Sequence, residues 1–162
     1  MRLTVGSRSY DLRTRALVMA VAGSTGDLVD QGADLVEVVD PAQPAPAPAC
    51  VVASDDDMVR RALSAGVALL RLPQPTPASL AMCAEAGAAV LVAGGAAAAA
   101  AAAGLPPERI ALDSLLLDVT GEQCPGAATA VGVIGGARIV RTADVAGARR
   151  ICDVLAAVLE SP

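Results

Sequence analysis

A glycine followed by a short apolar stretch recurs along the chain, and this repeated phrase limits the possible folds more than any other feature. It occurs at residues 32–37, 66–71, 87–92 and 136–141. Segments whose apolar residues have helical spacing lie between the phrases, among them 56–65, 77–86, 96–103 and 143–159. Strands that alternate with helices favour parallel pairing through right-handed crossovers. The pattern therefore predicts an α/β fold built on a parallel sheet.

Strands are expected near residues 17, 35, 51, 69, 90, 111 and 139, with a further candidate at 115–119. The proline-rich segment 41–48 cannot form a helix, because proline lacks a backbone donor, so one crossover helix is missing. The chain has 162 residues, whereas a complete eightfold barrel needs about 250. We expect one domain over residues 1–162, a reduced or distorted TIM (β/α) barrel of about seven parallel strands. A doubly wound open sheet is the alternative.

The first residues have the pattern of a small antiparallel unit. Residues 2–11 alternate apolar and polar side chains on both sides of Gly6-Ser7, which is typical of a β-hairpin with a glycine turn. We expect this N-terminal hairpin to be a lid or a decoration rather than part of the core.

The composition excludes several classes of partner. The chain is 54% hydrophobic but contains no Phe, no Trp and one Tyr, and its net charge is −5. The core must therefore consist of aliphatic residues, and the chain lacks aromatic platforms for bases and a basic surface for nucleic acid or anionic membranes. Small molecules or proteins are the expected partners.

Cysteine and histidine content bears on metal binding and location. The four cysteines are widely spaced and the chain has no His, which disfavours a zinc site. The first residues lack the apolar core of a signal peptide, so we expect reduced thiols and a cytoplasmic protein. The uncharged run 86–107 is long enough to raise the question of a membrane span. Because Gly94-Gly95 divides it, a strand followed by a polyalanine helix is the better interpretation.

The stretch 105–113 joins a helix end to a strand that delivers a carboxylate. Gly104 can end the alanine helix, Pro106-Pro107 prevents its resumption, and Ile110 to Leu112 form a short apolar strand before Asp113. In a parallel barrel the loops at the carboxyl ends of the strands carry the chemistry. A ligand-binding Asp113 and a turn-forming Asp113 both fit this spacing.

Two other polar segments have a structural and a functional interpretation. Residues 22–27 could hold a phosphate through backbone amides, but a plain glycine turn is favoured. Asp55, Asp56 and Asp57 follow Ser54, which predicts a helix start with Ser54 as the N-cap and acidic residues in the first turn, rather than a metal site.

The chain resembles dihydropteroate synthase, the pterin-binding barrel enzyme of folate biosynthesis, over nearly its whole length but with deletions. The resemblance rests on the N-terminal hairpin and on four phrases that occur in the same order, at residues 16–21, 32–38, 107–113 and 136–145. In that family a pterin pyrophosphate condenses with p-aminobenzoate. Carboxylates hold the pterin ring, and a magnesium-assisted site binds the pyrophosphate.

The resemblance implies roles for five residues. Asp113 and Glu37 would be pterin-binding carboxylates, with Glu37 standing where the family has Asp. Arg141, Thr25 and Asp27 would lie on the anion or p-aminobenzoate side. No catalytic residue and no metal ligand is assigned.

Departures from the family pattern are numerous. Gly23 replaces the metal-associated Asn of the first loop, and Val39-Asp40 with the proline segment replaces Gly-Gly-Glu-Ser-Thr. Arg71-Leu72 stands where an Asn-Asp pair is expected, the Ser-Arg-Lys segment is absent or collapsed into residues 122–126, and Ala143 replaces the terminal His. Losing an acceptor, a metal ligand and a catalytic Lys together would leave little activity. No cofactor is therefore expected, and magnesium only if the family activity survives.

Two functions compete. The first is a degenerate homologue without synthase activity, a pseudoenzyme with a scaffold or regulatory role, which associates through its apolar helices with itself, as a homodimer, or with an active homologue. The alternative is a residual pterin-binding protein or an altered transferase of folate biosynthesis that uses Asp113, Glu37 and Arg141. Glu37 and Arg141 also have a purely structural interpretation, an ion pair across the barrel mouth.

Overall fold

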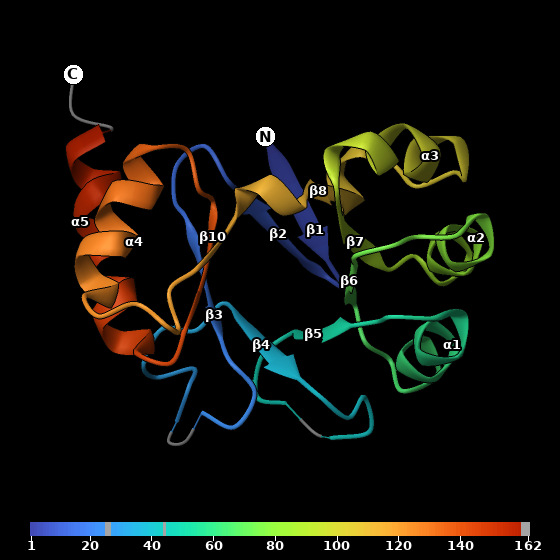
Figure 1. Ribbon diagram of the computed structural model, residues 1–162, viewed down its shortest axis with the longest axis horizontal. Helices are drawn as coiled ribbons and strands as arrows, with labels where there is room; N and C mark the ends of the chain where they lie inside the picture. The colour runs from blue at the N-terminus through green and yellow to red at the C-terminus, as the bar shows by residue number, and fades with distance from the viewer. Residues whose placement is uncertain (25–26, 44, 160–162) are drawn as a thin grey trace.

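An eight-stranded parallel sheet forms the centre of the molecule (Figure 1). The computed structural model of the chain describes residues 1–24, 27–43 and 45–159. The strand order is β8-β7-β6-β5-β4-β3-β10-β9, and every neighbouring pair is parallel. The strands are β3 (Leu17–Ala20), β4 (Leu35–Val38), β5 (Ala49–Val52), β6 (Leu69–Leu72), β7 (Ala89–Val92), β8 (Ile110–Leu112), β9 (Leu116–Asp118) and β10 (Ile139–Thr142).

The sheet curls into a nearly closed barrel. Its two edge strands, β8 and β9, are consecutive in sequence and are joined by a single 3-10 turn, η3 (Asp113–Leu115). A link of this length can span at most roughly 14 Å, so the two edges must approach each other. The predicted TIM-like barrel is confirmed, with eight strands rather than about seven. The additional strand, β9, is the candidate at residues 115–119.

Helices cover two sides of the barrel. In Figure 1, α1 (Asp56–Ser64), α2 (Pro77–Ala86) and α3 (Ala97–Ala102) lie on one side, and α4 (Pro125–Ile134) and α5 (Val145–Leu159) lie on the other. Short 3-10 turns, η1 (Gly94–Ala96) and η2 (Pro107–Arg109), precede α3 and β8. Within the described residues, the crossovers β3–β4, β4–β5 and β8–β9 contain no α-helix. The sequence predicted only the second of these losses.

Capping residues set the helix boundaries. Asp55, rather than the predicted Ser54, is the N-cap of α1, and its carboxylate accepts a hydrogen bond from the Met58 amide at 2.8 Å. A carboxylate gains additionally from the positive end of the helix dipole, and Ser54 instead donates to Asp55 at 3.0 Å. At the polyalanine segment the chain turns after α3 at Gly104, whose φ of +93° is favourable only for glycine. The run 86–107 therefore forms a strand and short helices, and none of the described helices is both long and apolar enough to cross a membrane.

Side chains alternate between two apolar clusters along the strands. One set faces the barrel interior, and the other packs beneath the helices and loops outside. The interior set includes Leu17, Met19, Leu35, Cys50, Leu69, Leu91 and Ile139. The outer set includes Val18, Val36, Val51, Leu70, Val90 and Val140.

The N-terminal hairpin belongs to the interior cluster. It consists of β1 (Arg2–Val5) and β2 (Arg8–Asp11), and its residues Leu3 and Val5, with Leu12 directly after it, are at most 1% exposed. The turn residue Gly6 lies against Ala68, just before β6, so the hairpin fills the amino-terminal end of the barrel. The prediction of a lid or decoration was wrong. An interior without Phe or Trp leaves space that these aliphatic side chains occupy.

A buried carboxylate connects the region after the hairpin to α5. Asp34 accepts hydrogen bonds from Arg15 Nη2 at 2.7 Å, Arg149 Nη1 at 2.9 Å and the Val18 amide at 2.9 Å. The hairpin residue Tyr10 donates its hydroxyl to the backbone oxygen of Asp34 at 3.3 Å, and burial raises the pKa of Tyr10. These contacts hold the amino-terminal end of the barrel together.

Shortening a buried side chain of the hairpin should destabilise the whole molecule. We expect Leu3→Ala to lower the free energy of unfolding by about 2–5 kcal/mol, because it leaves a cavity inside the barrel. The control Val29→Ala shortens a side chain of a residue that is 42% exposed between β3 and β4 and should change little. Urea unfolding of both variants measures the difference, and equal effects would contradict a role for the hairpin in the core.

Candidate functional site

Three charged residues face the barrel interior at the carboxyl ends of their strands. Glu37, Arg71 and Arg141 each lie two positions after an interior residue, in β4, β6 and β10 respectively. Since side chains two positions apart share a face of a strand, these three form a polar layer above the aliphatic interior. The carboxyl end is the face at which barrels of this type carry their sites.

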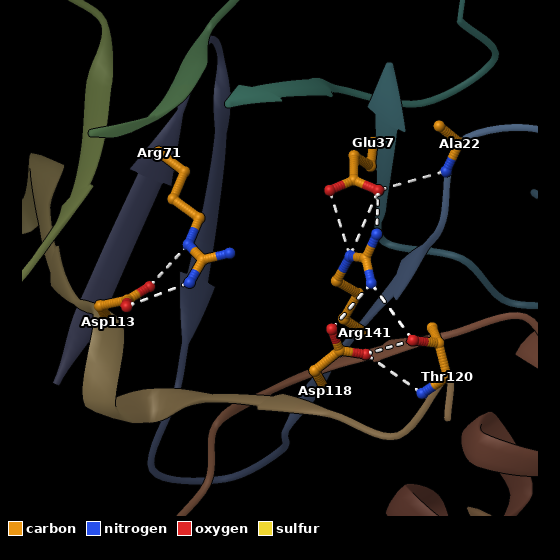
Figure 2. Close-up of polar contacts among 7 residues, drawn as sticks. All are labelled: Ala22, Glu37, Arg71, Asp113, Asp118, Thr120 and Arg141. Atoms are coloured by element: carbon orange, nitrogen blue, oxygen red, sulfur yellow. Dashed lines mark hydrogen bonds and ion pairs between the residues drawn. The ribbon is translucent and has the colours of Figure 1, made fainter. Parts of the chain in front are cut away.

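Arg141 is the centre of the larger polar cluster (Figure 2). Its Nη2 donates to Glu37 Oε2 at 2.6 Å, and its Nε lies 3.1 Å from Oε1 of the same carboxylate. Its Nη1 donates to Asp118 Oδ2 at 2.8 Å and contacts Thr120 Oγ1 at 3.4 Å. Glu37 also accepts a hydrogen bond from the Ala22 amide at 3.3 Å. All three guanidinium nitrogens of Arg141 are therefore engaged by the protein.

Arg71 and Asp113 form a second, separate pair (Figure 2). Arg71 Nε donates to Asp113 Oδ1 at 2.8 Å, and Nη2 donates to Oδ2 at 3.1 Å. Two parallel hydrogen bonds of this kind match the planar guanidinium to the carboxylate and fix its orientation. Both oxygens of Asp113 are thus engaged by a residue of the same chain.

The charges in these clusters compensate one another. The hydrogen bond with Glu37 raises the pKa of Arg141, and the one with Asp113 raises the pKa of Arg71. Burial acts to raise the pKa of Asp118, but hydrogen bonds from Thr120 and the charge of Arg141 bring it below its usual value. Burial, followed by the nearby charge of Glu37, raises the pKa of Cys50 to about 12, so this thiol in the interior is not a nucleophile at neutral pH.

An open recess of about 320 Å³ adjoins the Arg141 cluster. Its walls are mainly apolar and come from Ala22, Val38, Val39, Val52 and Met58, with Glu37 and Arg141 at one side. The recess offers apolar contact next to an ion pair whose charges are already matched. A magnesium site, which the sequence allows only if the family activity survives, does not fit this arrangement. Gly23 supplies no ligand, and the described residues contain no group of three His, Cys, Asp or Glu side chains placed to hold a metal ion.

The structure gathers three of the five residues named from the sequence at the carboxyl end. Glu37 and Arg141 form the ion pair that the sequence raised as a structural alternative, and Asp113 lies on the other side of the mouth. Asp27 is exposed and accepts from the Asp30 amide at 3.3 Å within a turn, while Thr25 lies outside the described residues. The ligand roles of all five stay predictions.

Sequence reasoning missed three participants. Arg71 was considered only as the loss of an Asn, although it supplies the partner of Asp113. Asp118 and Thr120 were not named. The rule that selected Asp113, a polar residue at the end of an apolar strand, could have selected Asp118 from the candidate strand at 115–119.

Comparison with known proteins shows a likeness in structure. No protein-family model and no curated protein matches the chain. The fold is similar to the Yersinia pestis dihydropteroate synthase, with a TM-score of 0.82, 16% identity and 99% of each chain covered. It is similar to 7,8-dihydropteroate synthase from Vibrio fischeri, with a TM-score of 0.78, 14% identity and coverage of 100% of this chain and 99% of that one. A third match is Mycobacterium tuberculosis Rv1207, with a TM-score of 0.74, 21% identity and coverage of 92% and 94%. At these identities the likeness shows the fold alone.

Removing one charge of the Glu37–Arg141 pair should lower the stability, because the other charge is left buried without a partner. We expect Arg141→Gln to lower the free energy of unfolding by about 3 kcal/mol, because Glu37, only 8% exposed, loses its partner. The double variant Glu37→Gln/Arg141→Gln should lose less than the sum of the two single variants. Arg60→Gln, which breaks an exposed pair with Asp57 on α1, serves as the control and should change stability little. Additive losses in urea unfolding would contradict the coupling.

Proposed function

We propose that this chain, which has the fold of the dihydropteroate synthases, is a pseudoenzyme without synthase activity that acts as a scaffold or regulator. The observation that carries the proposal is the bidentate contact between Arg71 and Asp113. Asp113 is the carboxylate that the family resemblance assigns to the pterin. In this chain its two oxygens accept from a guanidinium instead.

A pterin would have to displace Arg71 to reach Asp113. The amino edge of the ring donates hydrogen bonds, so it competes for the same two oxygens that Arg71 occupies. Arg71 and Asp113 are part-buried, with side chains 31% and 36% exposed. Separating a hydrogen-bonded charged pair of this kind costs about 1.5–3 kcal/mol, which the ligand would have to supply.

The second predicted carboxylate is engaged in a similar way. Glu37 binds Arg141 through both of its oxygens, and Arg141 uses its remaining terminal nitrogen on Asp118. An anion or p-aminobenzoate would therefore meet an arginine whose charge is already matched by two carboxylates. The engagement of both residues by the protein itself, together with the residues lost from the family pattern, supports a chain that has the barrel fold but no synthase activity.

One observation favours the alternative of a residual pterin-binding protein or an altered transferase. The recess beside Glu37 and Arg141 is open and has a volume of about 320 Å³, which is within the usual range of small-molecule sites. A ligand held mainly by its apolar walls would leave both ion pairs intact. The open recess is the feature that supports this alternative.

Titration with a pterin, followed by calorimetry, tests the proposal. We expect no saturable heat from the wild-type chain, because Arg71 occupies the acceptors. Arg71→Ala, which frees Asp113, should bind weakly where the wild type does not.

Two further variants identify the outcome that would contradict the proposal. Micromolar binding of the pterin by the wild type would contradict the proposal if Asp113→Asn abolished it and Asp57→Asn retained it. Asp57 is the matched control, since its side chain is 86% exposed on α1, away from the barrel mouth.

The proposed partner is a second copy of the chain, bound through the outer surface of α4 and α5. Of the nine exposed large apolar residues in the described part of the chain, five lie on these two neighbouring helices: Val131, Ile134, Val154, Val158 and Leu159. Each is more than 60% exposed, and α4 contains no charged residue. Two copies that paired through this surface would bury apolar area, and this burial is the main driving force for association.

Mass measurement by light scattering at several concentrations tests this surface. We expect a dimer that Val154→Lys converts to a monomer, because the new charge would have to be buried at the interface. Val29→Lys, at a residue that is 42% exposed elsewhere, should leave the mass unchanged. A wild-type chain that is monomeric at every concentration would contradict self-association without bearing on the pterin result.

A further inference from the structure

A small recess at the amino-terminal end of the barrel is lined by three arginines. Its volume is about 60 Å³, and its walls are Arg13, Arg15 and Arg138 with Thr14 and Cys152 on one part and aliphatic side chains on the rest. We call it the arginine recess. Arg13 and Arg15 lie between the hairpin and β3, and Arg138 directly precedes β10. The recess is therefore at the opposite end of the strands from Glu37 and Asp113.

Three guanidinium groups at one place are unexpected in this chain. The sequence has 12 basic and 17 acidic residues, so a cluster of positive charge runs against the overall balance. Like charges repel unless counter-charges or a ligand compensate them. The charged groups around the recess therefore decide whether it is already neutral.

Compensation in the arginine recess is incomplete. Arg15 pairs with Asp34 at 2.7 Å and lies 3.8 Å from Asp153, but both carboxylates are shared with Arg149. Within the described part of the chain, the one ion pair of Arg13 is with Asp11, at 3.5 Å, and its side chain is 78% exposed. Among the described residues, no carboxylate forms an ion pair with Arg138. The cluster therefore contains more positive than negative charge.

Arg138 is nevertheless held in place. Its Nη1 donates to the backbone oxygens of Val133 at 3.1 Å and Ala137 at 2.8 Å. Val133 lies in the last turn of α4 and Ala137 in the link between α4 and β10, so the guanidinium is close to the negative end of that helix. Arg15 is held by its hydrogen bond to the carboxylate of Asp34. Two of the three arginines are thus oriented before any ligand arrives.

We propose that the arginine recess binds a small oxyanion of the phosphate type. A volume of about 60 Å³ holds a few water molecules or one tetrahedral anion and is too small for a whole cofactor. Guanidinium groups match phosphate oxygens through paired hydrogen bonds. Cys152, in the same recess, has its pKa raised by burial and so adds no negative charge at neutral pH.

Titration of the full chain with inorganic phosphate at low ionic strength, followed by calorimetry, tests the site. We expect one saturable site with a Kd of about 1 mM or tighter. Arg138→Gln and Arg13→Gln should each weaken binding about tenfold, the effect of losing one charged hydrogen bond. Arg13 is largely exposed, so its variant should fold even if the loss of Arg138 disturbs α4.

The matched control is Arg60→Gln on α1, which should not change phosphate binding. Absence of saturable binding, or an equal loss in Arg60→Gln, would overturn the proposal. Phenyl phosphate distinguishes the source of the anion: tighter binding than inorganic phosphate supports the phosphate group of a larger molecule, and equal binding supports the free ion. Because the arginine recess and the pterin-facing residues lie at opposite ends of the barrel, either result can fail without the other.

Discussion

Arg141 holds together the carboxyl end of the barrel. It projects from β10, binds Glu37 on β4 across the intervening strand β3, and binds Asp118 at the end of β9 on its other side. One guanidinium therefore spans four adjacent strands. A charged group that faces a barrel interior is tolerated only when it is paired and hydrogen-bonded. Arg71 and Asp113 satisfy the same requirement between β6 and the turn after β8, so both inward-facing arginines at the mouth are paired with carboxylates of the same chain.

Much of the fold could be predicted, because buried parallel strands appear in a sequence as short continuous apolar runs. The glycine phrases located four of the eight strands of the sheet, other apolar runs located the rest, and the proline segment located one missing helix. The burial of the hairpin could not be predicted in the same way. Leu3 and Val5 alternate with polar residues whether the hairpin covers a surface or fills a barrel, and only the volume left inside an aliphatic interior decides between them. The direct link from β8 to β9 was harder to recognise, because residues 113–115 contain no proline that would exclude a helix as the segment 41–48 does.

The site was predictable in position but not in pairing. A residue at the end of a strand must lie at the carboxyl face, which placed Asp113, Glu37 and Arg141 there from the sequence. Which inward-facing groups pair depends on the order of strands around the ring. Arg71 and Asp113 are 42 positions apart, and Glu37 and Arg141 are 104 positions apart. Replacing an Asn by Arg71 was therefore interpreted as a lost contact, whereas in three dimensions it supplies a new one.

The hairpin has a consequence for how this molecule can be observed. Tyr10 is the only aromatic residue of the chain, and it lies in β2 with its hydroxyl bound to the backbone of Asp34. Tyrosine emission therefore reports on the contact between the hairpin and the amino-terminal end of the barrel. The helices and the parallel sheet are visible to far-ultraviolet circular dichroism. Tyrosine emission and circular dichroism follow different parts of one structure. If their unfolding transitions differ, the barrel keeps its secondary structure after the hairpin has dissociated from its amino-terminal end.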